Sequence, residues 1–328
     1  MNMMGKKTQL FFVENLTKRY NGHLAVDHLN FSIETGESFA LLGPNGAGKT
    51  TTIKMLTGQL KPTEGTIFFK GNEIKENLAE AKRQIGLVPD TSNLYPELSC
   101  WENLMFSAQL YGVPKQEREK HGAELLQHFD LYNRRKDRFR NLSRGLQKRI
   151  TIAAGLIHKP KILFLDEPTT GLDVQSARFI RKHLKNLHKQ GTTLFLTTHY
   201  IQEADELCER IGFLNNGIIR ALDHPDKLKA QVQENHILSL QFRESGEWGR
   251  ELKNLPIVEL VSKKGPIYTL HVTDTANAIP ALVDFSKTHN LTIRALNTLT
   301  PTLEDAFVKI TGSHPEQFVD SKQEGPRS

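Results

Sequence analysis

Residues 43–50, GPNGAGKT, constrain this chain more than any other stretch, because they match the pattern G-x-x-x-x-G-K-[S/T] at every fixed position. The apolar run Ser38–Leu42 before them predicts a buried strand, and Thr51–Gly58 after them predicts a short helix. Glycines let backbone N–H groups wrap a phosphate chain, and the helix N-terminus adds partial positive charge. Lys49 can neutralise the outer phosphates, and Thr50 can offer its hydroxyl to a phosphate-bound Mg²⁺. The stretch predicts a nucleoside triphosphate site.

The length and composition predict a cytoplasmic protein of two domains. The chain has 328 residues, of which 38% are hydrophobic and 24% charged, enough for packed cores. Its two cysteines, Cys100 and Cys208, exclude a disulfide framework and favour a reducing compartment. Residues 1–9 lack the apolar core of a signal peptide, and no apolar run is long enough for a transmembrane helix. We therefore expect a soluble chain that can still dock on a membrane protein.

The net charge of +6 can be interpreted in two ways, one without and one with a functional role. A mildly basic soluble protein explains it, and attraction to an anionic membrane surface or to nucleic acid would also fit. The positive residues do not form a patch interleaved with aromatic residues, so we expect no direct binding of nucleic acid.

The first part of the chain predicts antiparallel strands followed by a helical insertion. Leu10–Tyr20 and Asn30–Glu34 read as strands, with Asn21-Gly22 as a turn. Tyr20 is either an ordinary strand aromatic or a flat platform for an adenine ring. Helical periodicity then occurs at Trp101–Phe106 and Glu117–Phe129, within an insertion of about residues 91–141.

Two carboxylates follow an apolar strand in the middle of the chain. Ser143 predicts the N-cap of a helix that runs to about His158. Ile162–Leu165 then predicts a buried parallel strand that ends in Asp166 and Glu167, which places both acids beside the phosphate loop. Asp166 can hold Mg²⁺, and Glu167 can orient and polarise an attacking water.

A second strand brings a histidine to the same edge. Gly171–Asp173 predicts a turn before a helix at Val174–Lys189, and Thr192–Thr197 predicts a buried strand shortly before His199. A lone histidine is more often structural than catalytic, but this position allows its ring to donate a hydrogen bond to a γ-phosphate. Residues 211–221 predict a closing hairpin around Asn216-Gly217.

A small α+β domain is expected at residues 223–311. Strands at Ile237–Phe242, Ile257–Val261, Ile267–Val272 and Thr292–Leu296, with two helices between them, give the order β-α-β-β-α-β of a ferredoxin-like fold. Thr302 predicts the cap of a last helix. Residues 312–328 are polar and predict a disordered tail.

Taken in order, these motifs resemble the ATP-binding subunits of ATP-binding-cassette (ABC) transporters over about residues 10–222. Tyr20 matches the adenine-stacking aromatic, residues 43–51 the Walker A loop, and residues 142–146 the family's signature. Asp166 and Glu167 match the Walker B aspartate and the catalytic glutamate, residues 171–173 the D-loop, and His199 the switch histidine. The resemblance implies an α/β P-loop NTPase cassette at residues 1–222, with a mixed central sheet, an antiparallel β edge and a helical subdomain.

The resemblance also assigns roles to individual residues. Glu167, His199 and Lys49 would be catalytic, and Thr50, Asp90 and Asp166 would hold Mg²⁺. ATP would be bound by Tyr20, Gly43, Pro44, Asn45, Gly46, Ala47, Gly48, Lys49, Thr50, Thr51, Asp90, Ser143, Gly145 and Asp173. The family implies a head-to-tail homodimer in which each ATP lies between one subunit's phosphate loop and the other's signature helix.

Two positions depart from the family pattern. Arg144 and Leu146 replace the usual glycine and glutamine of the signature, and Asp90 stands where the Q-loop glutamine is usual. A carboxylate repels phosphate more than an amide does, and we expect Asp90 to couple Mg²⁺ to the membrane partner. Together with the C-terminal segment at residues 301–307, these departures resemble features of one branch of the family, the ATPases of bacterial ABC-2-type exporters of drugs and antibiotics.

The expected function is ATP hydrolysis that drives export through separate integral membrane permease subunits, on the inner face of the cell membrane. The alternative is a soluble ABC ATPase that acts on the ribosome or nucleic acid, but such proteins usually carry paired cassettes or long coiled coils. A P-loop kinase or GTPase has no use for the signature or the switch histidine. A degenerate, non-hydrolysing subunit is disfavoured by the intact Lys49, Asp166, Glu167 and His199.

Overall fold

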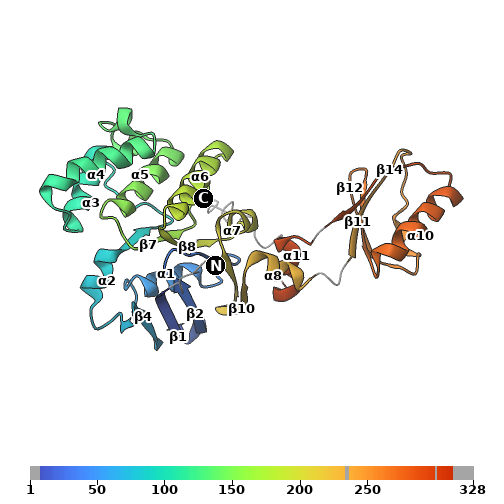
Figure 1. The fold of residues 1–328 in the computed structure, drawn as a ribbon, viewed down its shortest axis with the longest axis horizontal. Coiled ribbons are helices and arrows are strands. Elements are labelled where there is room, and N and C mark those ends of the chain that lie inside the picture. The colour runs from blue at the N-terminus through green and yellow to red at the C-terminus, as the bar shows by residue number, and fades with distance from the viewer. Residues whose placement is uncertain (1–7, 233–235, 300, 313–328) are drawn as a thin grey trace, which may run out of the picture. The chain divides into compact units, whose positions relative to one another are not determined.

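The computed structural model describes residues 8–232, 236–299 and 301–312, and its chain divides into two compact units (Figure 1). The first unit runs to His224 and the second begins at Pro225. The proposed disordered tail at residues 312–328 lies outside the described residues from residue 313 onward.

The first unit opens with an antiparallel sheet of strand order β2-β1-β4-β5. Its strands are β1 (Gln9–Tyr20), β2 (His23–Glu34), β4 (Glu64–Phe69) and β5 (Asn72–Glu73). The β1–β2 hairpin turns at Asn21-Gly22 as predicted, with positive φ at both residues. Strand β2 begins seven residues before the predicted Asn30, because Asp27 and His28 interrupt its apolar pattern while the backbone pairing with β1 continues.

The central sheet has the order β10-β9-β3-β8-β7-β6 and is mixed. The strands are β3 (Ser38–Leu42), β6 (Ile85–Val88), β7 (Ile162–Asp166), β8 (Thr193–Thr198), β9 (Arg210–Asn215) and β10 (Ile218–Asp223). Strands β6, β7, β8, β3 and β9 run parallel, and only β10 is antiparallel to its neighbour. Every residue of β3, β7 and β8 is buried, which is why these strands read as continuous apolar runs. Their carboxyl ends share one edge, where the predicted motifs follow.

Aromatic residues join the two sheets in one core. The Phe39 and Phe195 rings stack at 5.5 Å in the central sheet, and Phe31 of β2 stacks on Phe39 at 5.4 Å. Phe11 of β1 meets Phe164 of β7 edge-on at 5.5 Å. Each fully buried side chain of this size removes a large apolar area from water, so the antiparallel sheet is fixed against the central one.

Helices complete the first unit. They are α1 (Lys49–Leu56), α2 (Leu78–Gln84), α3 (Cys100–Leu110), α4 (Lys115–His128), α5 (Arg144–Leu156), α6 (Val174–Lys189) and α7 (Ile201–Leu207). Helices α3, α4 and α5 pack together as a helical layer (Figure 1). The α3 helix begins with a capping box: the Ser99 hydroxyl accepts from the Glu102 N–H and Glu102 accepts from the Ser99 N–H. The mixed sheet, antiparallel edge and helical layer agree with the predicted α/β fold.

The second unit contains a four-stranded antiparallel sheet of order β12-β13-β11-β14. Its elements are α8 (Pro225–Ala230), β11 (His236–Phe242), α9 (Gly249–Lys253), β12 (Val258–Lys264), β13 (Ile267–Val272), α10 (Thr275–Thr288), β14 (Ile293–Leu299) and α11 (Leu303–Thr311). The run from β11 to β14 has the predicted order β-α-β-β-α-β. Thr302 caps α11 as predicted, in a capping box with Asp305.

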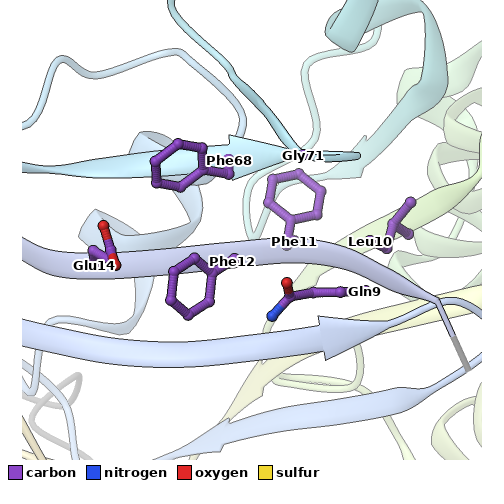
Figure 2. A pocket seen from close by; sticks show the side chains of 7 residues that line it. All are labelled: Gln9, Leu10, Phe11, Phe12, Glu14, Phe68 and Gly71. Atoms are coloured by element: carbon purple, nitrogen blue, oxygen red, sulfur yellow. The ribbon is translucent and has the colours of Figure 1, made fainter.

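A shallow hollow of about 270 Å³ lies along β1 and the end of β4, flanked by Phe12 and Phe68 (Figure 2). It contains none of the predicted site residues. Among the described residues, no helix combines the length and the apolar character needed to cross a bilayer.

Candidate nucleotide-binding and hydrolysis site

The phosphate loop, residues 43–50, joins β3 to α1, and its glycines are required by close backbone approaches. Gly48 has φ of 105°, and a Cβ there would lie 2.5 Å from the Ala25 carbonyl oxygen. A Cβ on Gly43 would lie 2.1 Å from the Leu214 carbonyl oxygen. Gly46 also has a positive φ, of 81°. Larger residues would push the loop away from neighbouring strands, so the glycines hold its N–H groups in a fixed cradle.

Lys49 is the first residue of α1 and is 6% exposed. Its Nζ donates to the carbonyl oxygens of Gly43 at 2.8 Å and Pro44 at 3.1 Å. The same Nζ forms an ion pair with Glu167 Oε1 at 3.1 Å. The ammonium group is thus held under the loop and beside the predicted catalytic carboxylate.

Asp166 ends β7 and pairs with the first turn of α1. Its Oδ1 accepts from Thr50 Oγ1 at 3.2 Å and from Thr197 Oγ1 at 2.5 Å. Burial raises the pKa of Asp166 above its ordinary value, although both hydroxyls oppose this shift. A carboxylate beside a hydroxyl is a hard-oxygen pair that suits Mg²⁺. Within the described ranges no group of three or more His, Cys, Asp or Glu side chains is arranged to hold a metal ion.

Glu167 lies in the left-handed region, with φ of 49°, and its N–H donates to the Thr197 carbonyl oxygen. Its Oε2 accepts from His199 Nδ1 at 2.8 Å and Thr170 Oγ1 at 2.9 Å. Burial alone would raise the pKa of Glu167, but the His199 hydrogen bond and the Lys49 charge outweigh it and the pKa is lowered. The carboxylate is therefore ionised at neutral pH, and the uncommon backbone conformation is held by several contacts.

His199 follows β8, and its side chain is 10% exposed. Because the ionised Glu167 is an acceptor, Nδ1 carries the proton of the 2.8 Å hydrogen bond. The other ring nitrogen, Nε2, takes no part in this bond. Lys49, Glu167 and His199 thus form one polar cluster at the carboxyl edge of the central sheet, as predicted.

Ser143, Gly145 and Asp173 lie at the starts of two neighbouring helices. Ser143 caps α5, accepting from the Leu146 N–H at 3.4 Å, and Asp173 caps α6, accepting from the Ser176 N–H at 2.9 Å. A Cβ on Gly145 would lie 2.2 Å from Ser176 Oγ. In the part of the chain that the structure describes, no hydrogen bond or ion pair connects these three residues to the polar cluster. They form a second group on the same subunit.

Tyr20 and Asp90 occupy exposed positions at strand ends. Tyr20 ends β1, is 45% exposed, and has Lys18 Nζ 5.3 Å from its ring centroid. Asp90 follows β6, and its carbonyl oxygen accepts from Lys148 Nζ at 3.3 Å. After burial and the charge of Glu167, the Asp90 charge also raises the pKa of Asp166. Asp90 therefore acts electrostatically on the predicted Mg²⁺ ligand.

Several residues that support the cluster were missed in the sequence. Thr170 and Thr197 donate to the two carboxylates, and Thr169 donates to the buried Glu203 at 2.8 Å. A threonine in a strand or turn is ordinarily read as β propensity or turn chemistry. The available signal was position, because all three threonines lie within three residues of Glu167 or His199.

Comparison with known proteins agrees with this geometry. The ABC transporter family profile matches residues 26–170, and a profile described as the C-terminal domain of DrrA1-3-like ATP-binding proteins matches residues 224–311. The linearmycin resistance ATP-binding protein LnrL of Bacillus subtilis is 36% identical, over 91% of this chain and 97% of LnrL. The Nod factor export ATP-binding protein I of Ralstonia nicotianae is 35% identical, over 93% of this chain and 94% of its own length.

A solved structure extends the likeness to the fold. The ATP-binding cassette MJ0796, a dimer in a post-hydrolysis state with ADP and Pi, is similar with a TM-score of 0.61 and 29% identity. The match covers 66% of this chain and 98% of that one. The chain is similar to these relatives over nearly their whole length, and its structure brings together the polar cluster of Lys49, Glu167 and His199. The chain therefore belongs to the ABC transporter family, as an ATP-binding subunit that hydrolyses ATP.

Proposed function

We propose that this chain powers an exporter, through ATP-driven closure of a homodimer docked on separate integral membrane permease subunits of the ABC-2 type. The observation that carries the proposal is the polar cluster of Lys49, Glu167 and His199, in a chain whose relatives are named for resistance and export. The chain would lie in the cytoplasm, peripherally on the inner face of the cell membrane. The cassette would comprise residues 1–222, and an accessory ferredoxin-like domain residues 223–311.

Within one subunit, the phosphate loop would bind the phosphates and Tyr20 would stack on adenine. Lys49 would neutralise the outer phosphates, while Thr50 and Asp166 would hold Mg²⁺, which supplies charge neutralisation at the phosphates when bound. Glu167 is ionised and can accept a proton from water or orient it. His199, oriented by Glu167, would donate from Nε2 to the γ-phosphate in the form in which both ring nitrogens carry a proton.

The position of the second group, Ser143, Gly145 and Asp173, favours the proposed homodimer. The α5 helix has 13 residues and is capped by Ser143, so its first N–H groups and partial positive charge suit an anion. This group has no hydrogen bond to the polar cluster of its own subunit among the described residues. A head-to-tail partner would bring it to the γ-phosphate, and the related cassette MJ0796 is described as dimeric.

Asp90 would couple the Mg²⁺ site to the permease. Its charge acts on Asp166, and its backbone is held by Lys148 of α5. Asp90→Ala should lower either the ATPase rate or transport, because it removes a charge beside the Mg²⁺ ligand. Transport assays in vesicles and phosphate release measure both, and unchanged values for both would refute the role.

The transporter assignment is tested by purifying the tagged full chain from detergent-solubilised membranes and identifying stoichiometric partners. We expect an integral membrane protein with several predicted spans of about 20 apolar residues each. The same preparation should hydrolyse ATP. Recovery of ribosomes or only soluble partners would instead favour a non-transport ABC ATPase.

A further inference from the structure

Glu203 of α7 is a buried carboxylate beside the hydrolysis site. The residue is 1% exposed, and its Oε1 accepts a hydrogen bond of 2.8 Å from Thr169 Oγ1. Thr169 is itself only 4% exposed. The bond therefore lies inside the protein, where water does not compete with it and where either partner left alone would be unsatisfied.

The bond joins the two segments that carry the hydrolysis pair. Thr169 lies in the turn directly after Glu167, and Glu203 lies in the first turn of α7, directly after His199. The neighbouring Thr170 donates to Glu167 Oε2 at 2.9 Å, and His199 Nδ1 contacts the same oxygen at 2.8 Å. The Thr169–Glu203 bond thus runs alongside the Glu167–His199 bond and ties together the backbones from which both side chains project.

The surroundings of Glu203 do little to stabilise its charge. Burial, with a smaller contribution from the charge of Glu167, raises its pKa to about 7, although Thr198, Thr169 and Arg181 of α6 oppose the shift. Its Oε2 has no well-formed hydrogen bond among the described residues, although the Thr198 hydroxyl is close enough to favour the charged form.

Two further titratable groups, Lys148 and Cys208, interact with Glu203. Burial lowers the pKa of Lys148 of α5, and the Glu203 charge partly opposes this shift. The pKa of Cys208, after α7, is raised chiefly by burial and then by the Glu203 charge. A buried carboxyl with one oxygen poorly partnered is unfavourable for folding. Such a group at a functional site indicates a function that outweighs its effect on stability.

We propose that Glu203 is a positioning residue for ATP hydrolysis, which through Thr169 keeps His199 and Glu167 in register for the attack on the γ-phosphate. The inference rests on the proposed roles of Glu167 and His199. Glu203 itself touches neither the phosphates nor the water, so its removal should lower kcat and leave ATP binding unchanged.

The test is a double-mutant cycle on the full-length chain. Glu203→Met and Thr169→Val each remove one partner with little change of volume, and each should lower kcat about tenfold, the effect of one buried hydrogen bond. The double variant should be no slower than either single variant, because both remove the same bond. KM and the Kd for ATP should stay at wild-type values.

Conservative and surface variants are the controls. Glu203→Gln keeps an acceptor for Thr169, and Thr169→Ser keeps the donor, so both should retain most of the wild-type kcat. Glu206→Gln neutralises an exposed carboxylate on the same helix, which pairs with Arg181, and should have no effect. Additive losses in the cycle, wild-type kcat in the double variant, or equal losses in kcat and ATP binding would each overturn the proposal.

Thermal unfolding at two pH values separates positioning from support of the fold. The pKa of Glu203 is about 7 in the folded chain, against 4.5 in the unfolded chain. As pH rises from 4.5 to 7, the unfolded chain therefore loses the Glu203 proton while the folded chain keeps it. Glu203 thus destabilises the wild type increasingly as pH rises from 4.5 to 7 and fully above pH 7, but not below pH 4.5. Glu203→Gln should have a higher Tm than the wild type, with the difference growing from pH 5 to pH 8, while kcat is kept.

A lower Tm of Glu203→Gln than of the wild type at pH 8 would mean that the carboxylate supports the fold instead. A wild-type chain that hydrolyses no ATP would refute the proposed function itself.

Discussion

Glu167→Gln is expected to bind ATP as tightly as the wild type and to hydrolyse it roughly 10²–10³ times more slowly. The amide keeps the shape of the side chain and can still contact Thr170 and Lys49, but it cannot accept a proton from water. In the wild type, His199 and Lys49 keep this carboxylate ionised against the effect of burial. The substitution therefore removes the ionised group that we propose for water activation.

Single-turnover phosphate release and nucleotide binding measure the two properties separately. Because the variant retains ATP, size-exclusion chromatography with ATP should detect a stable dimer that the wild type forms only briefly. The Glu206→Gln variant serves as the control for loss of an acidic charge. Normal turnover of Glu167→Gln would refute the assignment of this residue, and a monomer in the presence of bound ATP would contradict the proposed closure.

Lys49→Met should weaken ATP binding by about 10- to 100-fold and abolish measurable hydrolysis, because a hydrogen bond from a charged donor contributes about 1.5–3 kcal/mol. The ammonium group is 6% exposed and lies 3.1 Å from Glu167 Oε1. Its removal deprives the phosphates of one counter-charge and Glu167 of the ion pair that lowers its pKa. The catalytic carboxylate should then titrate at a higher pH.

Lys54→Met is the matched control, since Lys54 lies on the exposed side of the same helix. It should bind and hydrolyse ATP like the wild type. Titration with a fluorescent ATP analogue gives both affinities, and thermal unfolding confirms that each variant is folded. Equal affinities in the two variants would contradict the role of Lys49 in phosphate binding.

Local patterns predicted much of the fold and the identities of the reactive groups. The spacing of residues 43–50 was sufficient for the phosphate loop, since its glycines and lysine act within one turn of the chain. Apolar runs predicted β3, β7 and β8 because strands buried on both faces lose their polar alternation. Ser143 and Thr302 were recognised as caps because capping depends on three or four adjacent residues.

Patterns interrupted by polar residues were harder to read. The start of β2 was placed too late, because its pairing with β1 is a contact between backbones and not a preference of Asp27 or His28. Glu203 resembled an ordinary helix acid, and nothing in its neighbourhood along the chain indicates that it is buried. Its partner Thr169 lies 34 positions away.

By itself, the sequence determined the family and the α/β class and predicted the residues proposed to carry the chemistry, because these depend on the order and spacing of groups along one chain. Only the tertiary structure decided which of them meet. Thr50 reaches Asp166 across 116 positions, and His199 reaches Glu167 across 32. The parallel sheet creates these contacts by bringing the carboxyl ends of β3, β7 and β8 to one edge. The physical reason is that strand order and burial arise from packing of the whole unit, and this packing sets both the distances and the pKa values of the site.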